Sequence, residues 1–242
     1  MGFARKRLFY GVTFTLALFF VAPLMLIEGI YLYGLSLIHV LPPPPQQEPL
    51  PVLARAAIWA TFREQGPTKV KPIHSWDVLY SLIRMDGYLA PGYRIADYVA
   101  LRHFPEQDTA EGKLIRHIKD FSAAVWLSRN WTSDQIILEA GRLLPVLAGV
   151  EGVNNGSLKI FGKKIDELTT SETALILALE SFHGIEEEAV KRPKELLARR
   201  NRIVETMFRN GAISEADMQK AITQPIKLRN IGRDRSSRTK AK

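Results

Sequence analysis

The sequence contains no cysteine, which removes several classes of function at once. Without a thiol the chain can form no disulfide, no cysteine-ligated zinc site, no iron–sulfur cluster and no thiolate nucleophile. Glycine and proline are too few, at 16 and 14 of 242 residues, for a collagen-like chain. A content of 46% hydrophobic and 24% charged residues excludes a wholly disordered chain. We therefore expect one globular domain with additional segments.

Acidic residues are scarce relative to basic ones. The chain has 25 Asp and Glu against 33 Lys and Arg, a formal net charge of +8 at pH 7. This excess predicts an anionic partner, which could be nucleic acid, phospholipid headgroups or a phosphorylated substrate. Residues 227–242 carry seven of the basic residues and one Asp, without an apolar cluster. That composition is typical of a basic disordered tail.

Charged side chains are absent from residues 8–27, and the apolar character extends to residue 40 with one interruption at Glu28. About 20 apolar residues suffice to cross a bilayer as a helix, so residues 8–40 are predicted to be a transmembrane anchor region. A basic cluster at residues 5–7 precedes it, and residues 41–53 carry no Lys or Arg. The positive-inside rule then places residues 1–7 in the cytoplasm and the remainder outside. A cleaved signal peptide has the same pattern and is the alternative.

Residues 41–50 predict a Pro-rich linker, because four consecutive prolines at 42–45 forbid a helix and favour a stiff, extended spacer. From there to residue 226 the apolar residues follow helical spacing, and no run alternates strictly enough to predict a sheet. The fold class is therefore mainly α. Helices are expected at 53–62, 76–85, 93–103, 114–128, 135–147, 172–180, 195–210 and 215–223, with a loop at 149–156.

The helices near the C-terminus carry a recognisable pattern. The stretch FGKKIDELTTSETALILALESFHGI at residues 161–185 is followed, from residue 191, by KRPKELLARRNRIVETMFRNGAISEADMQKAITQPI. Together they resemble the C-terminal half of the family 51 glycosyltransferases, the peptidoglycan-polymerising domains of class A penicillin-binding proteins and monofunctional transglycosylases. The resemblance covers roughly residues 51–226. It implies a lysozyme-like α-helical transglycosylase domain whose substrate is lipid II, a diphosphate-linked disaccharide on a polyprenyl tail.

Combined with the predicted anchor, the resemblance implies a single-pass protein of the bacterial inner (cytoplasmic) membrane, with its main domain in the periplasm or outside the cell. The implied partners are lipid II or peptidoglycan glycan strands, the membrane itself and a cell-wall synthase. An external domain argues against nucleic acid as a partner. The residues indicate no cofactor and no metal site, although the resemblance allows a divalent metal.

The first catalytic motif of the family departs most from its pattern. The family has a Glu-Asp pair followed by Phe and His-x-Gly, and its first Glu is the general base. Here Thr61 stands at that position, and threonine cannot accept the proton at neutral pH. Glu64, three residues on, is a weak candidate for a replacement base. Within a helix that offset would turn its direction by about 60°.

The other motifs survive in part. In the third, Arg116 and Lys119 keep positive charge suited to a diphosphate, and Asp120 replaces the family's Glu. Asp120 is therefore the second weak catalytic candidate, and a solvated helix face is the alternative account of these three residues. The second motif keeps glycine and isoleucine, as Gly92 and Ile95, but not its hydroxyl and amide side chains.

Three further positions complete the pattern. Asn154 stands where the family has a carboxylate. Arg199 and Arg200 match family helix residues and are expected on a solvated face, paired with Glu195 or Glu205.

Because core and turn positions are kept while most chemical positions are changed, the sequence favours a catalytically degenerate pseudoenzyme that binds lipid II, glycan or a synthase. The alternative is an active peptidoglycan glycosyltransferase that uses a displaced carboxylate. A third hypothesis, a basic binder of nucleic acid or phospholipid acting through residues 227–242, depends on the tail alone.

Overall fold

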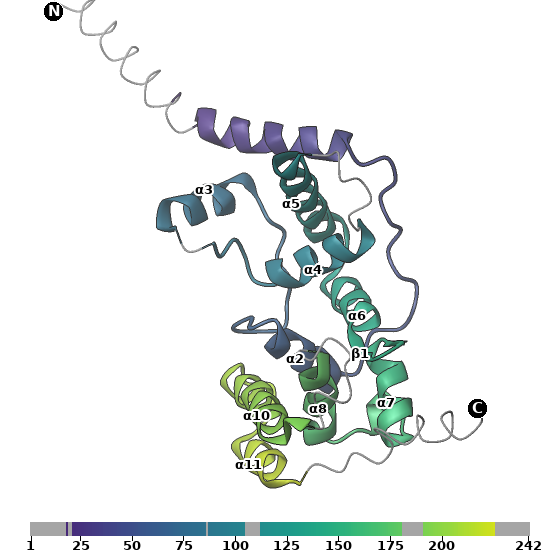
Figure 1. The fold of residues 1–242 in the computed structure, drawn as a ribbon. Helices are drawn as coiled ribbons and strands as arrows, with labels where there is room; N and C mark the ends of the chain where they lie inside the picture. The colour runs from purple at the N-terminus through teal and green to yellow at the C-terminus, as the bar shows by residue number, and fades with distance from the viewer. Residues whose placement is uncertain (1–17, 19–20, 86, 105–111, 181–190, 226–242) are drawn as a thin grey trace, which may run out of the picture.

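The computed structural model describes residue 18 and residues 21–85, 87–104, 112–180 and 191–225 (Figure 1). The predicted cytoplasmic N-terminus, residues 8–17, 19 and 20 of the predicted anchor region and the basic tail lie outside these described residues. Within them, no helix combines the length and apolar character needed to span a membrane.

The described part of the chain is mainly helical, which confirms the predicted fold class. Its elements, in chain order, are α2 (Val52–Thr61), α3 (Ser75–Arg84), α4 (Tyr93–His103), α5 (Lys113–Asn130), α6 (Ser133–Leu143), β1 (Pro145–Leu147), β2 (Val150–Glu151), α7 (Val153–Phe161), η1 (Ile165–Glu167), α8 (Thr170–Glu180), α10 (Pro193–Arg209) and α11 (Glu215–Thr223).

The region after α6 differs from the sequence prediction. The expected helix 135–147 ends at Leu143, and Pro145 begins a two-stranded antiparallel hairpin. Pro145 has no N–H to donate within a helix, and its ring blocks helical continuation. The expected loop 149–156 is mostly occupied by β2 and by the first turn of α7. Gly152, with a φ of 88°, redirects the chain between them, a backbone conformation that suits glycine.

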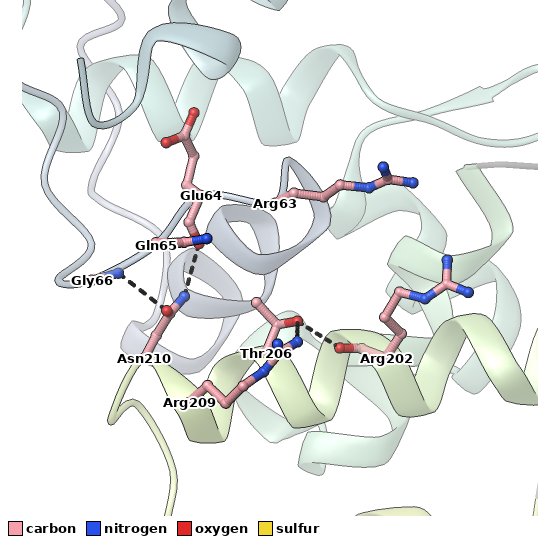
Figure 2. A pocket seen from close by; sticks show the side chains of 8 residues that line it. All are labelled: Arg63, Glu64, Gln65, Gly66, Arg202, Thr206, Arg209 and Asn210. Atoms are coloured by element: carbon pink, nitrogen blue, oxygen red, sulfur yellow. Dashed lines mark hydrogen bonds between the residues drawn. The ribbon is translucent and has the colours of Figure 1, made fainter. Parts of the chain in front are cut away.

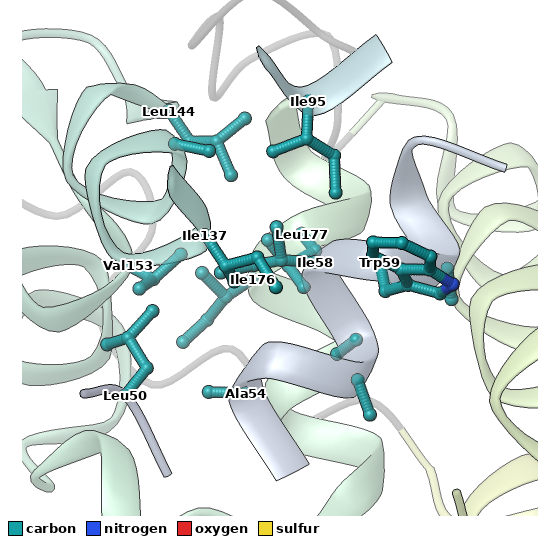
Figure 3. Close-up of a cluster of buried hydrophobic side chains, with 14 of the residues drawn as sticks. Leu50, Ala54, Ile58, Trp59, Ile95, Ile137, Leu144, Val153, Ile176 and Leu177 are labelled. Atoms are coloured by element: carbon teal, nitrogen blue, oxygen red, sulfur yellow. The ribbon is translucent and has the colours of Figure 1, made fainter. Parts of the chain in front are cut away.

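The main core is built around α2 (Figure 3). Ile58 and Trp59 of this helix are completely buried, beside Ile137 of α6 and Ile176 of α8. Helix α8 is buried along almost its whole length, as its continuous apolar run from residue 174 to 179 requires. This core holds the start of α4 and the C-terminal end of α2 in place.

Arg200 contradicts the prediction of a solvated face, because it is completely buried. Its guanidinium donates to the backbone carbonyls of Ile222 (2.7 Å) and Gln224 (2.6 Å), where α11 ends, and to Oγ of Ser171 on α8 (3.1 Å). A buried cation is stabilised when its donors meet carbonyl oxygens at a helix C-terminus. Arg199 behaves as expected and pairs with Glu195 at 2.9 Å.

Residues 21–36 form a helix that lies across the end of the domain, next to α5 (Figure 1). A Cβ on Gly34 would come within 2.1 Å of Oγ of Ser122 on α5, so the two helices approach as closely as a glycine permits. Glu28 of the same helix forms an ion pair with Arg129 at 2.7 Å, and the Arg129 guanidinium lies over the Tyr31 ring. These contacts attach the second half of the predicted anchor region directly to the domain.

Candidate functional site

The site expected for a general base lies where α2 ends. The backbone N–H of Glu64 donates to the Trp59 carbonyl and that of Arg63 to the Ala60 carbonyl. This pair of bonds is the Schellman arrangement, in which Arg63 takes the left-handed conformation, with a φ of 57°. The hydroxyl of Thr61 donates to the Ala57 carbonyl at 2.8 Å, inside its own helix. The expectation that Glu64 continues the helical rotation is therefore wrong, because the helix ends at Thr61.

Glu64 is completely buried, and its carboxylate turns toward the first turn of α4 (Figure 2). The backbone N–H of Arg94 donates to its Oε1 at 3.3 Å. Burial raises the pKa of the Glu64 carboxyl, and hydrogen bonds from the backbone N–H groups of Gly92 and Arg94 partly oppose this rise. Glu64 thus serves as an acceptor for the otherwise unpaired N–H groups at a helix N-terminus.

The backbone conformation and the surroundings of Gly92 explain why the second motif keeps its glycine. Its φ of 83° is left-handed, and a Cβ there would meet Val70 at 2.7–3.0 Å. A glycine is therefore required at this position, because Val70 lies too close to leave room for a Cβ. It brings the start of α4 against Glu64.

The third-motif residues lie on α5, which packs along α4. Asp120 is 8% exposed, and one of its carboxylate oxygens lies 3.7 Å from Nε of Arg116, one turn earlier. Lys119 is half-buried on the same helix. The solvated-face account of Asp120 is wrong, because that side chain is buried.

Asp97 of α4 faces this cluster and was missed by the sequence analysis. Burial and the negative charge of Asp120 raise the pKa of Asp97 to about 6. A hydrogen bond from Tyr93 opposes this rise. The same burial, with both carboxylates nearby, raises the pKa of the Tyr93 phenol. The Tyr93–Asp97 spacing of four residues, one helical turn, was the only local signal. The partner on α5 is 23 residues away, and no local pattern reveals it.

The structure therefore separates the two carboxylate candidates. Glu64 accepts from the backbone at the start of α4, whereas Asp120 meets Asp97 and Arg116 between α4 and α5. The second cluster places two carboxyl groups, a phenol and a guanidinium together. Such a cluster can exchange a proton near neutral pH and can hold an anion through its cation. We refer to Tyr93, Asp97, Arg116 and Asp120 as the α4–α5 cluster.

One further ionic network is structural. Glu139 is buried and accepts from Arg142 (2.6 and 2.8 Å) and from Nε2 of His103 (2.8 Å). Burial alone would raise its pKa, but these hydrogen bonds lower the pKa of Glu139 to about 2. Across the described ranges, no three His, Asp or Glu side chains gather as metal ligands.

Comparison with known proteins supports the family resemblance. The family model described as Transglycosylase matches residues 97–208. Residues 97–208, a little under half of the chain, are therefore similar to the transglycosylase family. The matched residues include the α5 motif and Asp97, and they exclude Thr61 and Glu64. This outcome confirms the resemblance seen in the sequence.

The similar proteins are all far longer than the matched segment. Penicillin-binding protein 1A of Rickettsia typhi is 33% identical over 126 residues, which cover 52% of this chain and 16% of that protein. The protein of the same name from Mycolicibacterium smegmatis is 26% identical over 181 residues, or 73% of this chain and 23% of that one. A crystal structure of penicillin-binding protein 1A from Haemophilus influenzae covers 59% of this chain and 17% of its own, with 21% identity and a TM-score of 0.32.

Proposed function

We propose that this chain is a membrane-attached, peptidoglycan glycosyltransferase-like protein that binds lipid II or glycan strands without polymerising them. The similarity to the transglycosylase family supports the peptidoglycan glycosyltransferase-like function. The burial of Glu64 carries the proposed loss of turnover. A general base must come within hydrogen-bond reach of the proton it removes. The Glu64 carboxylate instead faces the backbone of α4, and Thr61 is bonded within α2.

We assign the binding of lipid II or glycan to Arg116 of the α4–α5 cluster and to Lys119 beside it. Arg116 and Lys119 are half-buried on one stretch of α5, and guanidinium and ammonium groups are the usual protein ligands of phosphate oxygens. A diphosphate-linked sugar supplies such oxygens. A cell-wall synthase as a further partner remains part of this proposal, as does placement of the domain outside the inner membrane.

Polymerisation and binding can be measured on the same sample of full-length protein in detergent, with fluorescent lipid II. We expect lipid II to bind and no glycan polymer to form. Arg116→Gln and Lys119→Gln are expected to weaken binding roughly ten-fold each, because each removes a charge-assisted hydrogen bond. The matched control is Lys113→Gln, which removes the same charge from an exposed position on the same helix. Failure of the wild-type protein to bind lipid II would contradict the proposal.

A second candidate function, an active glycosyltransferase, rests on the Asp97 pKa of about 6. A carboxylate that titrates near neutral pH is suited to accept a proton from a sugar hydroxyl. Polymer formed by the wild-type protein and lost in Asp97→Asn or Asp120→Asn would assign this function. Loss in Glu64→Gln instead would show that Glu64 leaves its site against α4 during turnover.

A further inference from the structure

A pocket of about 620 Å³ lies between the loop that follows α2 and the C-terminal part of α10 (Figure 2). It is lined by Arg63, Glu64, Gln65, Gly66, Arg202, Thr206, Arg209 and Asn210. Three of these residues are arginines and one is acidic. The acidic residue is Glu64, whose carboxylate turns away from the arginines toward α4, as Figure 2 shows. The arginines therefore determine the charge of the pocket.

Two of the arginines come from one face of α10. Arg202, Thr206 and Arg209 follow at intervals of four and three residues, which places them side by side on a helix. The hydroxyl of Thr206 accepts from Nη2 of Arg209 at 2.9 Å and donates to the Arg202 carbonyl at 2.8 Å. The uncharged hydroxyl of Thr206 is thus a hydrogen-bond partner of the Arg209 guanidinium.

Arg63 comes from the loop after α2, and Asn210 attaches this loop to α10. The Asn210 amide donates to the Glu64 carbonyl at 3.0 Å, and its oxygen accepts from the N–H of Gly66 at 3.1 Å. Figure 2 shows the Arg63 and Arg202 side chains extending in the same direction from these two elements. Arg63 adopts a left-handed φ that costs about 1–2 kcal/mol for a residue with a Cβ. Side chains held in such a conformation are concentrated at functional sites.

We propose that this arginine pocket, defined by Arg63, Arg202 and Arg209, binds a phosphate-bearing anion through residues that are not part of the α4–α5 cluster. Guanidinium groups bind phosphate oxygens through paired hydrogen bonds, and three of them match a diphosphate better than a single carboxylate. The volume lies within the range of small-molecule sites, so the pocket can hold more than one phosphate group. The phosphate belongs either to a soluble molecule or to a lipid headgroup.

The test uses the full-length protein and two probes. Inorganic pyrophosphate binding is measured by calorimetry, and binding to vesicles is measured by co-sedimentation, with phosphatidylglycerol compared with phosphatidylcholine. Arg202→Gln and Arg209→Gln are each expected to weaken pyrophosphate binding roughly ten-fold. The control Lys194→Gln removes one charge from the same helix, about two turns before Arg202, and is expected to change it less than two-fold. Thermal unfolding followed by circular dichroism confirms that each variant is folded.

The two probes distinguish the source of the phosphate. A loss confined to pyrophosphate indicates a soluble ligand, and a parallel loss of phosphatidylglycerol-dependent vesicle binding indicates a lipid headgroup. Both results support the proposal that the arginine pocket binds phosphate. The proposal is overturned if pyrophosphate and vesicles bind the arginine variants as tightly as the control, or if Lys194→Gln weakens binding as much as Arg202→Gln. Neither outcome bears on lipid II binding at α5, because that test varies different residues.

Discussion

At the residue scale, the α4–α5 cluster brings two carboxyl groups together at a cost in stability. Asp97 ionises near pH 6 in the folded protein, above the ordinary value of 3.8. Because the folded state binds this proton more tightly than the unfolded state, the associated stability is present in full below pH 3.8. It is lost as the pH rises through 6. A buried group that reduces stability at neutral pH is a candidate for function.

Asp97→Asn is therefore expected to raise the free energy of unfolding at pH 7 by on the order of 1–3 kcal/mol, with little effect at pH 4. The asparagine oxygen can still accept from Tyr93, and the repulsion by Asp120 is gone. Urea denaturation at several pH values measures the effect. Asp166→Asn, an exposed position on η1, is the control and should show no such pH dependence. Equal gains at pH 4 and pH 7 would contradict the assigned cause.

Arg200 and Glu64 show how far the structural role of a charged side chain depends on its surroundings. Both are charged, and both are completely buried with backbone groups of another helix as partners. Arg200 meets carbonyls where α11 ends, and Glu64 meets N–H groups where α4 begins. Each charge thus lies at the helix terminus of opposite polarity. Their sequence contexts resemble those of exposed helix residues, so burial could not be predicted.

At the scale of the element, the end of α2 combines a helix stop with a functional loop. A left-handed residue at the position after the C-cap is usually glycine, because a Cβ is strained there. Here that position is Arg63, which points its guanidinium along the arginine pocket. Stability and anion binding therefore place opposite demands on this residue.

We expect Arg63→Gly to stabilise the protein by about 1 kcal/mol, since it relieves the left-handed strain. The same variant should bind pyrophosphate less tightly. Thermal or urea unfolding measures the first effect and calorimetry the second. Arg63→Ala is the matched control, because it loses the guanidinium but keeps the Cβ, and it should show the second effect alone. A destabilised Arg63→Gly would mean that the Arg63 side chain makes contacts that outweigh the strain.

At the scale of the whole molecule, apolar side chains remain exposed on α3 and at its C-cap residue, Met85. Helix α3 lies near the helix formed by residues 21–36 (Figure 1). Trp76 is 60% exposed, Ile83 70% and Met85 91%. The helix of residues 21–36 carries further exposed apolar side chains, such as Met25 and Leu32. Neighbouring exposed apolar side chains of this size commonly mark a membrane or protein contact. Their position beside the second half of the predicted anchor region favours the membrane.

This surface predicts that Trp76 enters the interfacial region of a bilayer, where tryptophan is favoured. In vesicles of brominated phosphatidylcholine, we expect the tryptophan fluorescence of the full-length protein to be quenched and Trp76→Phe to remove most of that quenching. Trp126→Phe is the control, because Trp126 is packed against the core. Quenching that survives in Trp76→Phe would place α3 outside the bilayer.

The sequence by itself determined the features that depend on near neighbours. The limits of α4 and α11 were predicted to the residue, and Thr132 and Ser214 cap their helices through bonds to residues three positions on. The helix predicted from residue 135 is present as far as Leu143, and the prediction for residues 144–156 was wrong because Pro145 was not given its weight as a helix terminator. The transglycosylase family was also visible from the pattern of kept core and turn positions.

Tertiary structure alone decided the chemistry of the candidate sites. It brought Asp97 to Asp120 across two helices, buried Glu64 against α4, and joined Arg63 to Arg202 and Arg209 from segments more than 130 residues apart. Helical periodicity and capping act within about four residues, so they specify elements and their ends. Burial and the pairing of charges depend on which elements pack together. These in turn set pKa values and the direction of each side chain, and they determine what the residues can do.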